Sequence, residues 1–505
     1  MIESHNWALL DEGGQHVVCQ FRPEDEDISS VYSDSVLRIR KPRDVGQVPD
    51  LDFIESYEAC VNGVLYPSSS SLRSSKIILD SSFLKELSRI IQRSRPIRFQ
   101  SSPLDGLLIG EVMPNALKLY KKPHNAGASL CGELSSIISL EIKVKGGLPS
   151  VSPFVAGAAS IKRQYGRHHL KQLACLGDST EFEEAVSHHP IDLGSRHYDT
   201  IRLSLSDLVK RPKKVLRCYV DGGLALGGFS ASGMPGQDAC EREEEWSVLC
   251  EKTLPGVPEA GEMVLSAVAS VLAHEDTAHC LLNVQKFDLI DIEGAGAIYD
   301  HLLSLLGSKD AVDASLLQGM LDMASLLKLL AQYFEACSVQ VQNKKNVDHI
   351  KSALPQVIQR LLSMCEDLPQ PSHANMLAFC AELSEQEGTT LLNLWLIALA
   401  AKDASLIVSL QCAHRKVSSP SSVGGAIEVK EHVKQTDERC GLTVLACSGS
   451  ARAEVSYTLA LVDIGYKNPA KCWNKRSKEE EFCERATKAA KPKQEVDIRT
   501  YRKED

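Results

Sequence analysis

The most informative stretch of the chain is Leu140-Glu141-Ile142-Lys143-Val144-Lys145-Gly146-Gly147, in which apolar and charged residues alternate. Successive side chains of a β-strand point to opposite faces, so this pattern predicts a strand over 140–145. One face would be apolar and would pack on a core, and the other would carry one glutamate and two lysines. That polar face could bind a phosphorylated ligand in a cleft, although a solvated surface is the more usual reason for such a pattern.

The elements on either side of this strand predict an α+β fold. Short runs of β-forming residues predict strands at 17–21, 36–40, 215–220 and 455–463, with a hairpin turn at 221–223. Apolar residues at helical spacing predict helices at 82–93, 202–209, 263–273, 314–333, 350–364 and 391–401. A Gly/Pro-containing acidic stretch at 233–245 is expected to be a surface insertion. The order is β-rich, then mixed, then helical, which indicates a two-lobed α+β or α/β protein.

Composition and charge restrict the function classes. The 505 residues are 43% hydrophobic and 24% charged, which is ordinary for a globular protein and excludes fibrous or wholly disordered classes. Fifty-six basic residues against 66 acidic ones give a formal net charge of −10. This balance argues against a nucleic-acid coat or a membrane-surface binder, but it allows a local basic pocket.

The cysteines and the start of the chain predict an intracellular protein. All 16 cysteines are scattered without a Cys-x-x-Cys pair, and residues 1–5 lack the basic and apolar regions of a signal peptide. Reduced thiols in the cytoplasm and/or nucleus are therefore expected. The longest apolar run, 391–401, is far shorter than the roughly 20 residues that span a bilayer, so no membrane association is expected.

A second basic cluster lies between residues 162 and 171, and it holds Lys162-Arg163 and Arg167-His168-His169-Leu170-Lys171. Such a cluster could bind several phosphates through charge-assisted hydrogen bonds. A solvated helix face and a nucleic-acid site are the alternatives. The nucleic-acid alternative is the weakest, because Tyr165 is the one aromatic residue there that could stack on a base.

Two aspartates are candidates for acid–base or metal chemistry. Asp403 follows the apolar run 391–401, and Asp463 ends the expected strand at 455–463. An aspartate at the end of an element bordering a cleft can accept a proton or hold a metal ion, although most such residues are caps or turn formers. Lys467 and Lys471 follow Asp463 at intervals of four.

Near the N-terminus, Gly13-Gly14 precedes a strand and could let backbone amides approach a phosphate, or simply form a turn.

Several sharper motifs are absent. His274 and His279 are one residue too far apart for the two-histidine zinc helix, and Cys365, His373 and Cys380 lack zinc-ligand spacing. No P-loop or dinucleotide fingerprint is found. No zinc is therefore expected.

Taken in chain order, these segments resemble the inositol-pentakisphosphate 2-kinase family, from about residue 7 to about residue 471. Residues 141–145 resemble the family's Glu-Ile-Lys-Pro-Lys, and 401–405 resemble Ala-Lys-Asp-Cys-Ser. Residues 463–467 are similar to Asp-Leu-x-Leu-Lys, and 7–18 to the glycine-rich opening. Residues 281–295, which include Gln285, closely resemble a segment of plant members.

The resemblance implies a fold and an activity. It implies a two-lobed kinase-like fold with a smaller β-rich N-lobe (1–125), a larger α/β, helix-rich C-lobe (126–471) and a charged tail (472–505). Its members transfer the γ-phosphate of ATP, with Mg²⁺, to the 2-hydroxyl of inositol 1,3,4,5,6-pentakisphosphate, giving inositol hexakisphosphate (phytate). A monomer that binds this inositol phosphate, and neither nucleic acid nor membrane, is expected.

The resemblance also implies roles for individual residues. Lys143 would lie near the transferred phosphate, Asp403 would accept the proton of the 2-hydroxyl, and Asp463 would hold magnesium. The expected ATP contacts are Gly13, Gly14, Gln15, His16, Arg38, Asn115, Glu141 and Arg217. The expected substrate-phosphate contacts are Arg98, Lys145, Arg167, Lys171, Lys214, Lys467 and Lys471.

The chain departs from the family pattern at several of these positions. Val144 replaces the signature proline, Arg167-His168 replaces His-Gln, and Lys214-Val215 replaces Asn-Asn. His16 replaces an asparagine, and Asn468 and Lys475 replace a proline and a tyrosine. The sequence therefore leaves open a non-catalytic inositol-polyphosphate-binding protein as the alternative to an active kinase, with a nucleic-acid binder ranked last.

Overall fold

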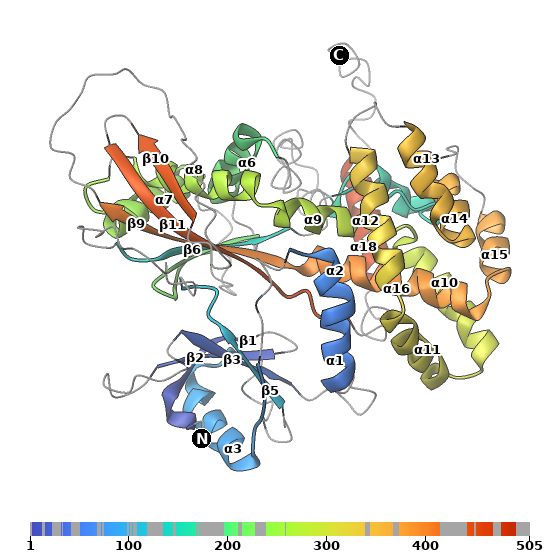
Figure 1. Ribbon diagram of the computed structural model, residues 1–505, viewed down its shortest axis with the longest axis horizontal. Coiled ribbons are helices and arrows are strands. Elements are labelled where there is room, and N and C mark those ends of the chain that lie inside the picture. Colours follow the sequence, from blue (N-terminus) through green and yellow to red (C-terminus); the bar gives the residue numbers. More distant parts are fainter. Residues whose placement is uncertain are drawn as a thin grey trace, which may run out of the picture.

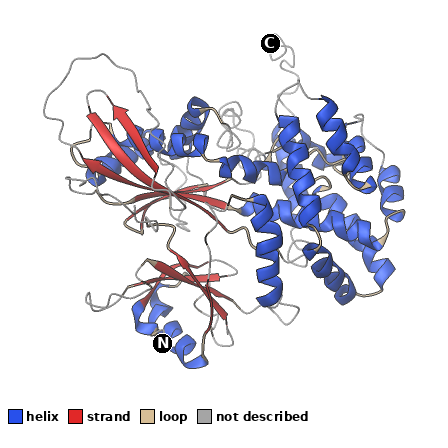
Figure 2. Cartoon of the chain, viewed as in Figure 1, coloured by secondary structure: helices blue, strands red, loops and turns tan. Residues whose placement is uncertain are grey.

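The structure of the protein is a computed structural model. It describes residues 3–12, 16–22, 32, 34–41, 51–67, 72, 75–97, 100, 104, 109–118, 135–144, 148–167, 170, 196–210, 215–227, 239–257, 259–338, 344–366, 373–414, 442–448, 451–467 and 476–490. Among these residues, helices and two antiparallel sheets make a mixed α+β protein, as expected (Figures 1 and 2).

The N-terminal sheet has five strands in the order β1-β2-β3-β5-β4. Their bounds are Trp7–Glu12 (β1), His16–Phe21 (β2), Ser35–Arg40 (β3), Ser75–Ile78 (β4) and Ile109–Pro114 (β5). Helix α3 (Ser81–Ile91) packs Leu84 and Leu87 against Trp7 and Leu37 of this sheet. The Asp80 carboxylate caps the helix by accepting a hydrogen bond of 2.7 Å from the Phe83 amide. The predicted strands 17–21 and 36–40 and the helix at 82–93 are confirmed.

The larger sheet has six strands in the order β10-β11-β9-β6-β7-β8. Their bounds are Ile138–Lys143 (β6), Leu216–Val220 (β7), Gly223–Leu226 (β8), Ser405–His414 (β9), Leu442–Ser448 (β10) and Ala451–Val462 (β11). Every described ladder in it is antiparallel. The α/β character expected for this part of the chain is therefore wrong. The β7–β8 hairpin turns at Asp221 and Gly222, whose positive φ values of 50° and 80° suit the right-handed twist of the strands.

Strand β6 lies in the centre of this sheet between β7 and β9. Leu140, Ile142 and Val144 are buried in the core, as the alternating pattern predicts. Next to the sheet lie α6 (Tyr198–Lys210), α7 (Ala239–Thr253) and α8 (Ala260–His274), and α8 contacts β9, β10 and β11; Figure 1 shows α6 above the sheet. Helix α7 begins inside the stretch 233–245, where a surface insertion was predicted; its residues 243–245 are exposed, and residues 233–238 lie outside the described part.

A helical body lies beside the larger sheet (Figure 1). Its helices are α9 (Asp276–Gln285), α10 (Asp291–Leu306), α11 (Lys309–Leu321), α12 (Ala324–Ser338), α13 (Lys344–Ala353), α14 (Gln356–Glu366), α15 (His373–Ala381) and α16 (Glu385–Asp403). The single helices predicted at 314–333 and 350–364 are wrong, because each consists of two. The second break lies at Pro355, which disfavours helical backbone at the residue before it.

Two further features are the length of the apolar helices and a helix within the predicted charged tail. Across the described ranges, no helix is by itself both long and apolar enough to cross a membrane; α11 and α12 meet that test together, but with a bend of 68° between them. Within the predicted tail 472–505, helix α18 (Arg476–Ala490) buries Cys483 and Ala486 against Ile161 and Leu170.

The two sheets approach each other through a small apolar cluster. Ala116 and Leu117, which follow β5, pack with Tyr219, Ile407 and Ala460 of the larger sheet. Figure 1 shows the N-terminal sheet below the larger one, with the short helix α1 (Leu51–Tyr57) at the side. Polar side chains from both sheets meet next to this cluster.

Candidate active site

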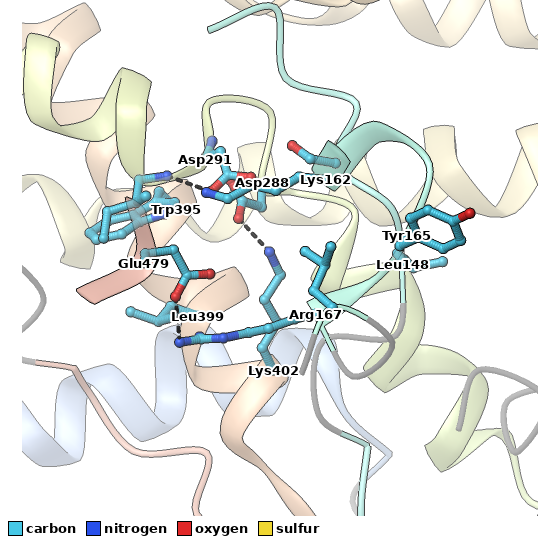
Figure 3. Close-up of a pocket in the computed structure, with 13 residues that line it drawn as sticks. Leu148, Lys162, Tyr165, Arg167, Asp288, Asp291, Trp395, Leu399, Lys402 and Glu479 are labelled. Atoms are coloured by element: carbon cyan, nitrogen blue, oxygen red, sulfur yellow. Dashed lines mark hydrogen bonds and ion pairs between the residues drawn. The ribbon is translucent and has the colours of Figure 1, made fainter. Parts of the chain in front are cut away.

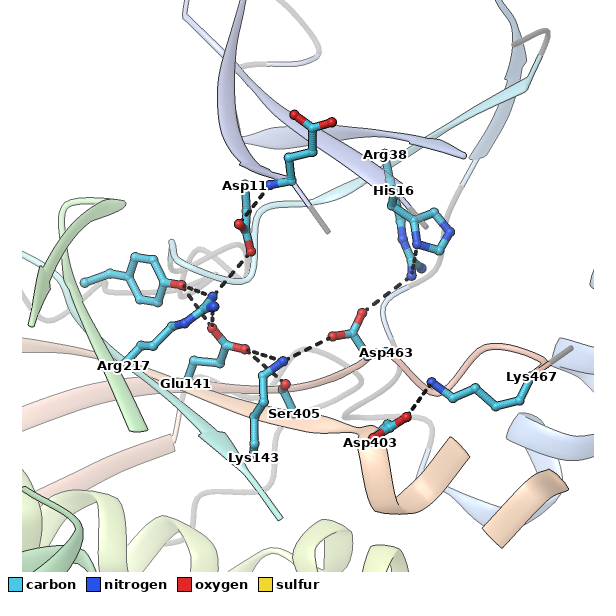
Figure 4. A network of polar contacts seen from close by, with 12 residues as sticks. Asp11, His16, Arg38, Glu141, Lys143, Arg217, Asp403, Ser405, Asp463 and Lys467 are labelled. Atoms are coloured by element: carbon cyan, nitrogen blue, oxygen red, sulfur yellow. Dashed lines mark hydrogen bonds and ion pairs between the residues drawn. The ribbon is translucent and has the colours of Figure 1, made fainter. Parts of the chain in front are cut away.

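An arc of polar contacts joins the two sheets (Figure 4). It runs from Asp11 on β1 through side chains of β7 and β6 to Asp463 after β11, and returns to β3 and β2. Its successive contacts are Asp11–Arg217 (3.3 Å), Arg217–Glu141 (3.2 Å), Glu141–Lys143 (3.6 Å), Lys143–Asp463 (4.0 Å), Asp463–Arg38 (3.5 Å) and Arg38–His16 (3.2 Å). Five of the residues with predicted roles in ATP binding or catalysis therefore lie in one arc with the predicted magnesium ligand.

Glu141 lies in the buried part of this arc. Its Oε2 accepts hydrogen bonds from Arg217 (3.2 Å) and from the Tyr219 hydroxyl (2.9 Å), and its Oε1 accepts one from Ser405 Oγ (3.0 Å). Burial opposes the charge of Arg217, but Glu141, Tyr219 and Asp11 together outweigh it and raise the pKa of the guanidinium. Burial, together with the Glu141 carboxylate, raises the pKa of Tyr219. Glu141 thus fixes Arg217, whose Nη1 also reaches Asp11 of the N-terminal sheet.

Lys143 and Asp463 meet where two strands end. Lys143 is the last residue of β6, and its side chain is 17% exposed. Asp463 follows β11 directly, has φ of 65° and a side chain that is 46% exposed. An aspartate tolerates this left-handed backbone better than most residues. The arrangement places one ammonium and one half-exposed carboxylate side by side at the ends of two strands.

Asp403 lies next to this pair. It is the last residue of α16, and its Oδ2 is 3.5 Å from Nζ of Lys467, which lies four residues after Asp463. Two residues further on, Ser405 pairs with Lys143 across the β6–β9 ladder. Lys143, Asp403 and Asp463 are thus brought together from segments up to 320 residues apart in the sequence, as the prediction required. Figure 4 shows the Asp403–Lys467 pair beside the end of the arc.

The remaining described nucleotide candidates differ in what they do. Arg38 also contacts Glu111 at 3.8 Å, so two carboxylates flank its guanidinium. Asn115 is buried directly after β5, and its side chain accepts a hydrogen bond of 3.0 Å from the Leu117 amide. Asn115 therefore closes a turn where the two sheets meet, and its role toward ATP stays a prediction.

In the described part of the basic cluster 162–171, Lys162 and Arg167 are paired with carboxylates. Buried Lys162 contacts Glu293 at 2.7 Å and Asp291 at 3.3 Å, and Arg167 contacts Glu479 of α18 at 3.0 Å. Arg163 donates to the carbonyls of residues 152, 153 and 155. Through these contacts the described cations connect segments of the fold to one another. Arg167 contacts helix α18, which is not part of the arc.

Lys162, Arg167, Asp291 and Glu479 line a cavity of about 70 Å³ together with Asp288 and Lys402 (Figure 3). The Lys402 ammonium contacts the Asp288 carboxylate. Burial and the nearby Asp291 carboxylate raise the pKa of Glu293 to about 7. Although burial works against it, the ammonium groups of Lys162 and Lys402 lower the pKa of Asp291. The cavity is thus lined by ion pairs, and one of its lining residues, Lys402, directly precedes Asp403.

Eight of the predicted site residues lie outside the described residues. They are Gly13, Gly14, Gln15, Arg98, Lys145, Lys171, Lys214 and Lys471. The structure adds three side chains that the sequence analysis did not single out, namely Asp11, Tyr219 and Ser405. Ser405 and Asp11 belong to the quoted segments 401–405 and 7–18 and could have been found there, whereas Tyr219 carried no local signal.

Asp463 is the candidate magnesium ligand. Within the described ranges, no group of three or more His, Cys, Asp or Glu side chains is placed to hold a metal ion. Magnesium, however, is commonly bound by one or two carboxylates together with substrate phosphates and water. The half-exposed carboxylate of Asp463, at the open side of the arc, fits such a shared site.

Comparison with known proteins identifies the family. A sequence model of the inositol-pentakisphosphate 2-kinases matches residues 10–481. The inositol-pentakisphosphate 2-kinase of Arabidopsis thaliana is 24% identical over 281 residues, which cover 53% of this chain and 59% of the relative. Those of Oryza sativa subsp. indica and subsp. japonica are each 30% identical over 203 residues, covering 38% of this chain and 42% of theirs. The chain thus spans about half the length of the curated relatives it matches. The match over residues 10–481 includes every residue of the arc, and the chain belongs to the inositol-pentakisphosphate 2-kinase family.

Proposed function

We propose that the protein is an ATP-dependent kinase that phosphorylates the 2-hydroxyl of inositol 1,3,4,5,6-pentakisphosphate and forms inositol hexakisphosphate. The observation that carries this proposal is the convergence of Lys143, Asp403 and Asp463. The cationic side chains of Arg38, Arg217 and Lys467 lie beside them. Phosphoryl transfer needs little covalent chemistry from the protein and depends on positioning and charge neutralisation. A site of this composition supplies both.

In the proposed reaction the two sheets act as the two lobes of a kinase-like fold. The N-lobe (1–125) would contribute His16 and Arg38 to the nucleotide, and the C-lobe (126–471) would contribute Glu141 and Arg217. The Arg217–Asp11 contact at 3.3 Å supports a nucleotide site between them, because it links the lobes.

The acceptor side of the reaction depends on Asp403 and Lys467. The Asp403 carboxylate would accept the proton of the 2-hydroxyl as this oxygen attacks the γ-phosphorus. Lys143 would neutralise charge on the transferred phosphoryl group, and Lys467 would bind a phosphate of the inositol ring. Because Lys467 already contacts Asp403 at 3.5 Å, a ring phosphate on this lysine would bring the substrate next to the base. Magnesium, held by Asp463 and the nucleotide phosphates, would draw charge from the γ-phosphate.

A non-catalytic inositol-polyphosphate-binding protein is the second candidate. It is favoured by one observation: Arg167, which stands where the family has His-Gln, is engaged by Glu479. This protein would bind the same inositol phosphates and leave ATP unchanged.

The deciding experiment supplies purified protein with ATP, Mg²⁺ and inositol 1,3,4,5,6-pentakisphosphate. The kinase should form inositol hexakisphosphate and ADP in equal amounts, and Asp463→Ala should abolish both. Binding of the inositol phosphate without any ADP would establish the second candidate. Other inositol phosphates, tested in parallel, would define the preferred isomer.

We further propose a monomer that acts in the cytoplasm and/or nucleus without nucleic-acid or membrane partners. The formal net charge of −10 and the scattered cysteines support this. Sedimentation analysis and retention on DNA or RNA at low salt would test the monomer and the absence of nucleic-acid binding. Imaging of the tagged protein would test the compartment.

A further inference from the structure

Gln285 connects the two chain segments that carry Lys143 and Asp403. It is the last residue of α9 and is 2% exposed. Its Nε2 donates a hydrogen bond of 2.8 Å to the carbonyl of Val144 and one of 3.3 Å to the carbonyl of Ala401. Val144 directly follows Lys143, and Ala401 precedes Asp403 by two residues. A single buried amide therefore ties the end of β6 to the end of α16.

Both acceptors are carbonyls that regular secondary structure does not fully satisfy. The last four carbonyls of a helix have no intrahelical donor, and Ala401 O otherwise receives the Ala404 amide at 3.4 Å. Val144 lies beyond Lys143↔Ser405, the last pair of the β6–β9 ladder. An amide NH₂ group has two donor hydrogens, and Gln285 places one on each segment.

A neighbouring contact strengthens the same end of the helix. Asp288, three residues after Gln285, contacts Lys402, which adjoins Asp403. The end of α9 and its connection to α10 thus hold the end of α16 at two points, the Ala401 carbonyl and the Lys402 side chain. Neither Gln285 nor Asp288 contacts Lys143 or Asp403 directly among the described contacts.

Building on the proposed function, we propose that Gln285 is a positioning residue for phosphoryl transfer, because its amide fixes the Lys143 ammonium relative to the Asp403 carboxylate. The reacting groups must be held within a fraction of an ångström, and a displacement of about 1 Å costs on the order of 10²-fold in rate. Loss of the amide should let the two segments shift apart. Ground-state binding of ATP and of the inositol phosphate uses other residues and should persist.

The test compares kcat and KM of two variants with the wild-type protein. Gln285→Met keeps the length of the side chain and removes both donors, so kcat should fall by about 10–100-fold with KM for both substrates nearly unchanged. Asn393→Leu is the matched control. Asn393 is fully buried in α16, ten residues before Asp403 at the end of that helix. Its Nδ2 donates a hydrogen bond of 3.0 Å to Leu316 O. This variant should lower thermal stability and leave kcat close to the wild-type value.

Gln285→Glu provides a second readout that does not depend on how well Gln285→Met folds. The neutral acid can donate one hydrogen bond to a carbonyl, whereas the carboxylate donates none. The kcat of this variant relative to wild type should therefore rise as the pH is lowered. A flat ratio would contradict the proposal.

The outcomes separate this inference from the function on which it rests. An active wild type with Gln285→Met no slower than Asn393→Leu, or slowed through KM alone, would overturn the positioning role and leave the kinase proposal intact. A wild type that forms no product from any inositol phosphate would overturn the kinase proposal itself, and the positioning role with it.

Discussion

Replacing Asp403 by asparagine tests the proposed proton transfer most directly. Asparagine has nearly the same size and keeps one oxygen acceptor, but it cannot take up the proton of the 2-hydroxyl. A general base contributes about 10²–10⁴-fold to a rate, which is about 3–5 kcal/mol of activation free energy at about 1.36 kcal/mol per factor of ten. The value of kcat for Asp403→Asn should therefore fall by about 10²–10⁴-fold.

The same substitution should hardly change the free energy of unfolding. Asp403 is 39% exposed, and an ion pair of this kind, here with Lys467 at 3.5 Å, contributes about 0–1 kcal/mol. Removing a negative charge from a helix C-terminus raises the free energy of unfolding by about 0.3–1 kcal/mol. The two changes therefore offset each other. Affinity for the inositol phosphate should be kept or increased, because Lys467 loses a competing carboxylate.

Single-turnover rates and substrate affinities, measured side by side, would check this prediction. Asp276→Asn is a matched control. Asp276 forms an exposed ion pair with Arg196, in which the two charged groups are 3.0 Å apart, and it is not one of the residues of the candidate site. The control should keep the wild-type rate. An Asp403→Asn protein that reacts within a factor of about three of wild type, far less than a general base contributes, would refute the assignment of the base.

Three further predictions concern the metal ligand and the ion-pair cluster. Asp463→Asn should lower kcat/KM by about 10²-fold and raise the Mg²⁺ concentration required, with little loss of stability because asparagine tolerates φ of 65°; a Mg²⁺ titration identical to wild type would count against the role. Lys162→Met should lower the free energy of unfolding by about 3–5 kcal/mol in denaturant, because it leaves two mostly buried carboxylates without their shared ammonium group, whereas the exposed Arg89→Met should cost less than about 0.5 kcal/mol; equal losses would contradict this. The pKa of Glu293 is raised from 4.5 to about 7 in the folded protein, so the folded state binds more protons than the unfolded state in this interval and stability should fall as pH rises through it. Glu293→Gln should remove that fall in pH-dependent unfolding, and an unchanged slope would show that another group causes it.

Local patterns predicted the strand that carries the site. The alternation of residues 140–145 is a property of neighbouring residues, because strand side chains point to opposite faces in turn. Leu140 and Ile142 are indeed fully buried, and Lys143 points to the other side. The break at Pro355 was also readable from the sequence, whereas the break at Asp322-Met323 has neither glycine nor proline to mark it.

Pairings across long sequence separations could not be predicted in this way. The cations of 162–171 suggested phosphate binding, but their carboxylate partners lie far away in the chain: 131 residues on for Lys162–Glu293 and 312 for Arg167–Glu479. Nothing in the local sequence indicates that such partners exist. A count of nearby cations therefore says little about which of them can bind a ligand.

The physical difference between the two basic regions lies in the exposure of the carboxylates. Asp403 and Asp463 are 39% and 46% exposed and contact their lysines at 3.5 and 4.0 Å, so separating these pairs costs little. Asp291 and Glu293 are 16% and 17% exposed, and parting them from Lys162 would leave two mostly buried carboxylates without the ammonium group that they share. A phosphate can therefore replace the carboxylate beside Lys143 or Lys467, but not the carboxylates beside Lys162. Under the proposed function, this difference explains why the substrate would bind at Lys143 and Lys467 and not at Lys162.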